Sequence, residues 1–358
     1  MQAAFYTIML DEIFIACLFL AIAFTFRWAF RTLPHEGWQI ICCFPYRKLP
    51  DGNWQGWNLT WYGFFNAVAI VFGVSVLLIL MGALSMPLIP LALIFILIII
   101  ICLPAARITA FLIEKKPNTY SVGGASFVGI LIAPWLIFLV RLAGNKWLGL
   151  NISIINILSA LSIAYTLGEG VGRLACISFG CCYGKPLKEC HPLIRIIFSR
   201  HNFIFTGKTK KIAYAHALDG QQIIPVQAMT NLIYSITGLI GFYLFLKGFT
   251  ATAFLLTLTV TQIWRFLSEF LRADYRGEGE ISTYQKMSLL ACLYGLLTAY
   301  IFYEPVLNKP VLLTGLLTLF NPVLFLFLTA LWIITFIYMG KSKVTAALID
   351  IHVNEENI

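Results

Sequence analysis

The chain reads Gly172-Arg173-Leu174-Ala175-Cys176-Ile177-Ser178-Phe179-Gly180-Cys181-Cys182-Tyr183-Gly184 where an apolar segment meets a polar loop. This stretch gathers glycines, cysteines and one arginine at the edge of a membrane-like run. A segment that only spans a bilayer needs none of these residue types, because apolar side chains are sufficient for that purpose. The stretch therefore predicts a site at the end of a membrane helix rather than a simple anchor.

The composition of the whole chain is that of a membrane protein. Hydrophobic residues make up 60% of the 358 residues and charged residues only 11%, whereas a soluble domain is about half apolar and about a quarter charged. Nine apolar runs approach the about 20 residues that a helix needs to cross the hydrocarbon core. We therefore expect an all-α polytopic membrane protein, a bundle of about eight or nine transmembrane helices with a small polar head excursion. The runs occupy residues 8–30, 61–84, 87–106, 121–142, 148–168, 226–246, 250–271, 287–302 and 312–339.

Polar segments between the runs predict the domain organisation. Residues 1–60 hold an extra N-terminal membrane helix and a polar loop, residues 61–340 form the main membrane domain with an excursion at 180–224, and residues 341–358 form a polar tail. No cleaved signal peptide is expected, because the N-terminus lacks a basic leader. Two alternatives stay open inside these units. Asn321-Pro322 indicates either one kinked helix or a short re-entrant piece before a final span, and stretches 194–198 and 203–205 indicate either short strands or interfacial segments.

The basic residues bear on orientation. A net charge of +9 suits a protein that meets anionic lipid headgroups, and no nucleic-acid-binding pattern accompanies it. Lysine and arginine are concentrated in the loops after the first, third, fifth and seventh runs. Taken alone, this distribution predicts that the cysteine-containing loop faces the cytoplasm.

Charged residues also lie inside or at the ends of the apolar runs, where a charge is costly and usually faces a protein interior or a watery cavity. Arg265, Glu269 and Arg272 share one helical face, so Glu269 can pair with either arginine. A pair that snorkels from a helix end is the alternative. With Arg173 added, the arginines favour a phosphate-binding cavity, because guanidinium binds phosphate bidentately. The charged residues in question are Arg107, Arg141, Arg173, Arg265, Glu269 and Arg272.

Several short motifs follow one another in a family-specific order between residues 61 and 285. They are Trp61-Tyr62-Gly63, Ala106-Arg107, Gly123-Gly124-Ala125-Ser126-Phe127, Gly172-Arg173, the weaker Pro225-Val226-Gln227, Arg265-Phe266 with Glu269-Phe270-Leu271-Arg272, and Ser282-Thr283-Tyr284-Gln285. The ordered set resembles the prolipoprotein diacylglyceryl transferase family. These bacterial inner-membrane enzymes move a diacylglyceryl group from phosphatidylglycerol to the lipobox cysteine thiol of a preprolipoprotein.

Some positions depart from the family pattern. Val128 stands where the family has a histidine proposed as catalytic, and valine cannot take a proton. Cys176 and Cys181 stand where the family signature has asparagine and glutamate, and Ile224 replaces the histidine of a His-Pro-x-Gln block. The first apolar run precedes the helix of Tyr62 and is not required by the seven-helix family pattern.

The resemblance implies roles for individual residues. Arg173 and Arg265 would be catalytic, because preorganised guanidinium groups stabilise a leaving glycerol phosphate, and Glu269 would orient Arg265. Without the family histidine, either the positive potential of the cavity lowers the pKa of the incoming thiol, or the protein catalyses another reaction. The predicted substrate-binding residues are Tyr62, Arg107, Gln227, Gly184 and Arg272.

The resemblance also implies partners and a location. The expected partners are phosphatidylglycerol, a preprolipoprotein or other thiol-bearing acceptor, and the lipid bilayer, with no cofactor and no nucleic acid. The expected location is the bacterial inner membrane, in many passes. We follow the family in placing the signature loop on the periplasmic side, against the charge count. Two rival functions are a related lipid-headgroup transferase with a different acceptor and a non-catalytic lipid-binding or lipid-moving paralogue.

The cysteines of the opening stretch allow several roles. Cys176, Cys181 and Cys182 are candidates for a redox or structural function, and packing alone is the preferred interpretation. The spacing Cys-x4-Cys-Cys is not one of the compact pairs of structural zinc sites, so no metal is predicted. A disulfide fits an oxidising periplasm. A covalent nucleophile at Cys181 or Cys182 has no histidine at a matching family position to activate it.

Overall fold

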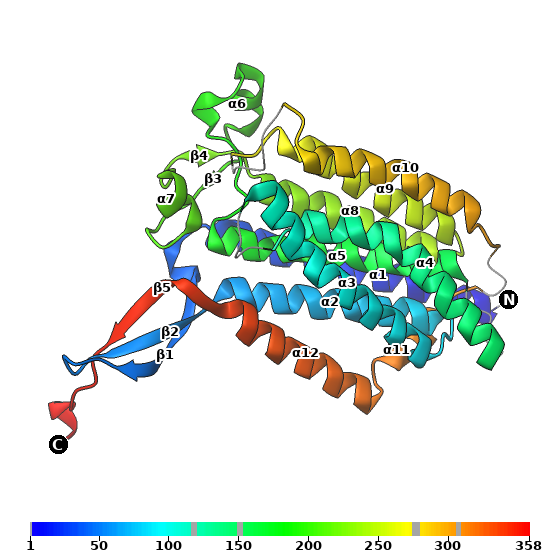
Figure 1. Cartoon of the computed structure of the whole chain (residues 1–358), viewed down its shortest axis with the longest axis horizontal. Coiled ribbons are helices and arrows are strands. Elements are labelled where there is room, and N and C mark those ends of the chain that lie inside the picture. Colours follow the sequence, from blue (N-terminus) through cyan, green and yellow to red (C-terminus); the bar gives the residue numbers. More distant parts are fainter. Residues whose placement is uncertain (1, 116–119, 149–152, 274–279, 306–308) are drawn as a thin grey trace.

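The computed structural model describes residues 2–115, 120–148, 153–273, 280–305 and 309–358. Within these ranges, nine helices of 19 or more residues run side by side (Figure 1), one for each apolar run. They are α1 (Gln2–Thr32), α2 (Trp61–Ala83), α3 (Leu88–Glu114), α4 (Val122–Leu148), α5 (Ile154–Phe179), α8 (Val226–Leu246), α9 (Thr250–Glu269), α10 (Thr283–Ile301) and α12 (Pro322–Gly340).

Seven of these helices, in the part of the chain that the structure describes, are long and apolar enough to cross a membrane: α1, α2, α3, α4, α5, α8 and α12. Helices α9 and α10 are the least apolar of the nine. The predicted class, an all-α polytopic membrane protein, is confirmed. The count of eight or nine crossings stays a prediction.

Helix α5 lies at the centre of the bundle, against α2, α8 and α9. Small residues let its backbone approach α2 closely. A Cβ on Gly73 of α2 would lie 3.1 Å from the carbonyl oxygen of Ala164, and one on Gly168 of α5 would lie 3.2 Å from that of Ala69. Close backbone packing is a principal source of helix association in lipid, where burial of apolar side chains contributes little.

The polar excursion after α5 folds into short elements at one end of the bundle (Figure 1). They are α6 (Pro192–Phe198), β3 (Phe203–Ile204), α7 (Lys211–His216) and β4 (Gln222–Ile223), with β3 and β4 paired antiparallel. Of the two alternatives left open for 203–205, the short strand is the one observed, over Phe203–Ile204. Stretch 194–198 is not a strand but part of a helix, because Pro192 occupies the first turn and His191 caps it.

A second sheet joins the two ends of the chain. Strands β1 (Ile40–Lys48), β2 (Trp54–Thr60) and β5 (Lys341–Ile349) form one antiparallel sheet in the order β1-β2-β5. The first two belong to the N-terminal polar loop, and β5 belongs to the segment expected to be a polar tail. The sequence analysis did not predict this pairing.

The apolar run at 312–339 divides into two helices. A short helix, α11 (Leu312–Thr318), precedes α12, and the side chain of Asn321 accepts a hydrogen bond from the Val323 amide at the start of α12. Asn321-Pro322 is thus an N-terminal cap followed by proline in the first turn. Of the two predicted alternatives, the short piece before a final helix is the one observed, rather than a single kinked helix.

Lys210 connects the excursion to the bundle. Its side chain is fully buried, and its ammonium group donates to the carbonyl oxygens of Leu33 at 3.1 Å and Ser178 at 2.6 Å. Leu33 follows α1, and Ser178 lies in the last turn of α5. Removal of the ammonium from water lowers the pKa of Lys210 from 10.5 to about 8.

We expect this buried lysine to make stability depend on pH. Between pH 8 and 10.5 the unfolded chain holds more protons at Lys210 than the folded chain, so the free energy of unfolding should rise with pH in that window. The gain amounts to about 3 kcal/mol at most. Thermal unfolding in detergent of wild type and Lys210→Met should therefore diverge above pH 8. The exposed neighbour variant Lys208→Met should follow the wild type, and parallel curves for Lys210→Met would contradict the assignment.

Candidate functional site

The residues singled out by sequence motifs gather at one end of the bundle. Tyr62 and Gln227 lie at the starts of α2 and α8, whereas Arg173 and Arg265 lie near the ends of α5 and α9. Since α2 and α8 run opposite to α5 and α9, all four positions fall at the end that carries α6 and α7 (Figure 1).

A shared carboxylate forms the centre of this end. Glu169 pairs with Arg173 one turn further along α5, and its Oε1 lies 3.7 Å from Nη2 of Arg265 on α9. Arg265 also donates to the hydroxyl of Tyr165 at 2.5 Å. The three charged side chains are 12 to 15% exposed. One negative charge thus lies between two arginine side chains, which stay positively charged because arginine is not deprotonated in proteins.

Several buried polar atoms near this centre find no hydrogen-bond partner among the described residues. A buried polar atom without a partner costs free energy, so such a group of atoms indicates a place built to meet a polar ligand. The atoms are Nε of Arg173, Nε of Arg265, Oε1 of Gln227, both amide atoms of Asn231, Oγ of Ser235 and Nε2 of Gln262.

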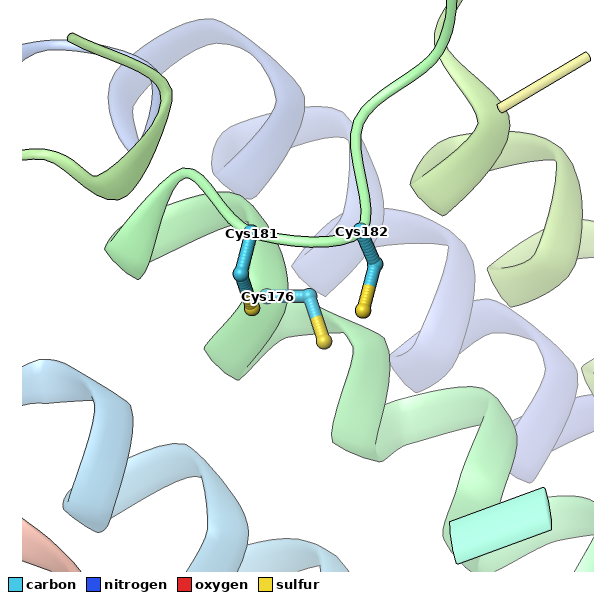
Figure 2. A group of neighbouring side chains, drawn as sticks. All are labelled: Cys176, Cys181 and Cys182. Atoms are coloured by element: carbon cyan, nitrogen blue, oxygen red, sulfur yellow. The ribbon is translucent and has the colours of Figure 1, made fainter. Parts of the chain in front are cut away.

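The same region contains three thiols (Figure 2). The Sγ atoms of Cys176, Cys181 and Cys182 all lie within 4.8 Å of one another. Nη1 of Arg173 lies 4.0 Å from Sγ of Cys176, and Nε2 of Gln227 donates to the carbonyl oxygen of Cys181 at 2.8 Å. None of these three cysteines forms a disulfide with another described cysteine. The thiols therefore adjoin the arginine centre directly.

The chain between the thiols is shaped by two left-handed residues. Gly180, at φ +68°, ends α5 because glycine adopts this conformation without steric cost. Cys182 adopts φ +55°, which is unusual for a residue with a side chain. Hydrogen bonding with Cys176 and Cys182, followed by burial, raises the pKa of Cys181 well above its ordinary value. At neutral pH, Cys181 is therefore protonated and is not a thiolate nucleophile.

Gly184 lies where three segments meet. A Cβ on this residue would come 2.4 Å from the carbonyl oxygen of Ile224. On the other side, the backbone around Gly184 bonds with the segment after α9: Lys185 donates to Leu271 at 2.9 Å and Ala273 donates to Tyr183 at 3.1 Å. Only glycine fits such a close backbone approach. The loop that carries Cys181 and Cys182 is thereby fixed to α9.

The family profile of prolipoprotein diacylglyceryl transferases matches residues 53–301. The chain belongs to that family.

Two curated relatives support this membership. The chain is similar to phosphatidylglycerol–prolipoprotein diacylglyceryl transferase 2 of Clostridium perfringens (strain 13 / Type A), with 29% identity over 43% of this chain and 52% of the relative. It is also similar to phosphatidylglycerol–prolipoprotein diacylglyceryl transferase of Clostridium tetani (strain Massachusetts / E88), with 27% identity over 41% of this chain and 53% of the relative. The matches thus span about half the length of these relatives. No solved structure matches.

In this transferase-family site, the structure brings together only part of the predicted set. Arg173, Arg265, Gln227 and the three cysteines adjoin one another. Tyr62 joins them from α2, where its ring packs on Phe179 with centroids 5.2 Å apart. Arg107 is instead exposed on α3, within electrostatic reach of Tyr338 on α12.

The carboxylate between the two arginines is Glu169, which the sequence analysis did not select. Glu269, the residue expected to orient Arg265, is partly buried at the end of α9. The signal for Glu169 was available, because Glu169 and Arg173 have the same i, i+4 spacing as Arg265 and Glu269. Its position directly at the end of the apolar run 148–168 strengthens that signal.

The block that contains Val128 also flanks the site. A Cβ on Gly123, at the start of α4, would lie 3.1 Å from Nη1 of Arg265. The start of α4 therefore packs against Arg265.

We expect Glu169→Gln to destabilise the protein more than Glu269→Gln. Removing the shared carboxylate leaves two buried guanidinium groups uncompensated, which costs about 3 kcal/mol. Thermal unfolding of both variants in the same detergent provides the comparison. A larger loss for Glu269→Gln would show that Glu269, and not Glu169, is the main counter-charge.

Proposed function

We propose that this family member transfers a diacylglyceryl group from phosphatidylglycerol to the cysteine thiol of a preprolipoprotein. The observation that carries the proposal is the pair Arg173 and Arg265 around the single carboxylate of Glu169. The surplus positive charge, held in a largely buried position, suits the phosphate of an anionic lipid. The names of the two clostridial relatives give the same donor and acceptor for those proteins.

The chemistry follows from where charge develops. The thiol sulfur attacks the glycerol carbon that bears the phosphate, the carbon–oxygen bond breaks, and its electron pair leaves with glycerol phosphate. Negative charge grows on the phosphate oxygens in this step. Guanidinium groups already in position stabilise that charge without reorganisation, which typically contributes a factor of about 10²–10³ in rate per donor.

Other residues of the site have supporting roles in the proposal. The unpartnered amide and hydroxyl atoms of Asn231, Ser235 and Gln262 suit the hydroxyl groups of a glycerol headgroup. Tyr62 and Gln227 lie beside the thiols and bind the substrate from that side. Arg107, Gly184, Glu269 and Arg272 keep the roles that the resemblance implies.

The proposed location is the bacterial inner membrane, with the arginine end of the bundle facing the periplasm. The helices that precede the basic loops, α1, α3, α5 and α9, all end at this end of the bundle (Figure 1). If the arginines of the site bind a substrate anion, their position does not indicate the orientation of the protein in the membrane. The count of basic residues then gives weaker support for a cytoplasmic loop.

Complementation of a bacterial strain depleted of its own transferase tests the function. Wild type should restore the lipid-dependent gel mobility of a prolipoprotein, and Arg173→Ala or Arg265→Ala should reduce conversion by about 100-fold or more. Arg195→Ala changes an exposed arginine of α6 outside the cluster and should behave as wild type. A well-expressed wild type that gives no conversion would contradict the proposal and favour a lipid-binding paralogue or another acceptor.

Paired reporter fusions on either side of α8 test the orientation. Alkaline phosphatase fused after Lys211 should be active, because this point lies at the arginine end of the bundle. The same reporter fused after Gly248, at the other end of α8, should be inactive, and a cytosolic fluorescent reporter should give the opposite pattern. Activity only at Gly248 would place the site in the cytoplasm and overturn the proposed location.

A further inference from the structure

The geometry of the three thiols approaches that of a metal site. Cys176 comes from the last turn of α5, and Cys181 and Cys182 follow the turn at Gly180, so their sequence spacing hides a compact cluster. A metal ion with Zn–S bonds of about 2.3 Å in tetrahedral geometry holds its sulfur ligands about 3.8 Å apart. The Sγ atoms already lie within 4.8 Å of one another (Figure 2). These separations therefore exceed those of a bound site by at most about 1 Å.

The backbone conformation is a second, independent observation. Cys182 is held at φ +55°, a conformation that costs free energy for a residue with a Cβ and tends to occur at functional sites. Together with Gly180, it reverses the chain so that all three sulfur atoms lie on one side (Figure 2). Gln227 fixes the carbonyl of Cys181 from α8. The cluster is thus supported by groups outside its own loop.

The surrounding charge suits a bound metal thiolate. Three thiolates and one divalent cation carry a net charge of −1. Nη1 of Arg173 lies 4.0 Å from Sγ of Cys176 and supplies the opposite charge and a hydrogen-bond donor to sulfur. Donors of this kind around metal-bound sulfur tune metal affinity and orient the ligands.

The three cysteines differ in burial. Cys181 is 8% exposed, whereas Cys176 and Cys182 are half-buried. Three protein ligands with an accessible fourth position are the pattern of a catalytic rather than a structural zinc site. Thiolate ligands prefer zinc-class and other soft ions to calcium or magnesium.

We propose that Cys176, Cys181 and Cys182 bind one Zn²⁺-class divalent metal ion whose fourth position takes the thiol of the acceptor. The metal site is inferred from the geometry of the three thiols, and the binding of the acceptor thiol rests on the proposed transferase function. The sequence spacing alone predicted no metal, because it could not show that the turn at Gly180 folds Cys181 and Cys182 back onto Cys176.

Such a metal answers the loss of the family histidine at Val128. A thiol that coordinates the metal is deprotonated, and its proton passes to water. The metal-bound sulfur then uses its lone pair to attack the glycerol carbon, while the carbon–oxygen electron pair leaves with glycerol phosphate next to Arg173. The thioether product has no negative charge and dissociates from the metal, which returns to its initial state. No oxidant or reductant enters the step.

Metal content of the full-length protein provides the first test. Protein purified in detergent with a reductant should bind one equivalent of Zn²⁺ by elemental analysis, and Co²⁺ should give the intense sulfur-to-cobalt charge-transfer absorption of thiolate ligation. The affinity should fall at least about tenfold in each of Cys176→Ser, Cys181→Ser and Cys182→Ser. The matched controls Cys190→Ser and Cys292→Ser should retain it. The charge-transfer absorption of the Co²⁺-bound wild type tests the site without any substitution, so this result does not depend on whether the variants fold.

Two outcomes would overturn the metal site. One is wild-type protein without charge-transfer absorption. The other is a disulfide among the three cysteines, found by thiol counting in protein kept under air, which would instead make the cluster a redox or structural element.

A thiol peptide tests the fourth position. A lipobox peptide added to the Co²⁺ protein should shift the visible cobalt bands, and the same peptide with serine in place of cysteine should not. An unchanged spectrum overturns the acceptor assignment. These readouts need neither phospholipid nor turnover. If the protein binds the metal but does not complement the depleted strain, only the transferase function is refuted. If the protein complements the strain but binds no metal, only the metal site is refuted.

Discussion

Charge balance around Glu169 is the constraint on which the arrangement of this end of the bundle depends. Arginine stays protonated in a protein, so two guanidinium groups among helices require counter-charge or strong hydrogen bonding. Here α5 supplies the carboxylate to both its own Arg173 and to Arg265 of α9. The shared ion pair fixes the two helices together, and it leaves one positive charge without an equal partner. A single interaction therefore stabilises the packing and creates affinity for an anion.

Helix α5 concentrates the chemistry because its polar residues follow the helical repeat. Tyr165, Glu169, Arg173 and Cys176 are spaced by four, four and three residues, so they share one face. Most of the other residues of α5 are apolar or small, and the helix is packed against its neighbours. A helix that is buried on most sides holds its polar stripe rigidly, which suits electrostatic preorganisation. The left-handed turn at Gly180 then extends the stripe by bringing Cys181 and Cys182 back beside Cys176.

The sequence predicted the membrane class, the helical segments and Arg173 with Arg265, because hydropathy and intramembrane charge are local signals. Glu169 was missed although the sequence contained a signal for it, because Glu169 and Arg173 have the i, i+4 spacing of an ion pair on one helix. The contact of the three thiols and the β2–β5 pairing could not be predicted, because they depend on turns and on segments about 285 residues apart. Local periodicity identifies helices but carries no information on which distant polar stretches meet.

The β2–β5 pairing has a consequence for biogenesis. Strand β2 is synthesised long before β5, which follows it by about 285 residues. The central strand of the sheet therefore has one open edge throughout the synthesis of the eleven described helices α2 to α12, and it closes only when α12 has delivered β5 to the same side. Thr60 is bonded to the carbonyl of Gly340 at 2.9 Å at the base of that sheet, one residue before the helix of Tyr62. The arrival of β5 is thus coupled directly to the final position of a helix that borders the site.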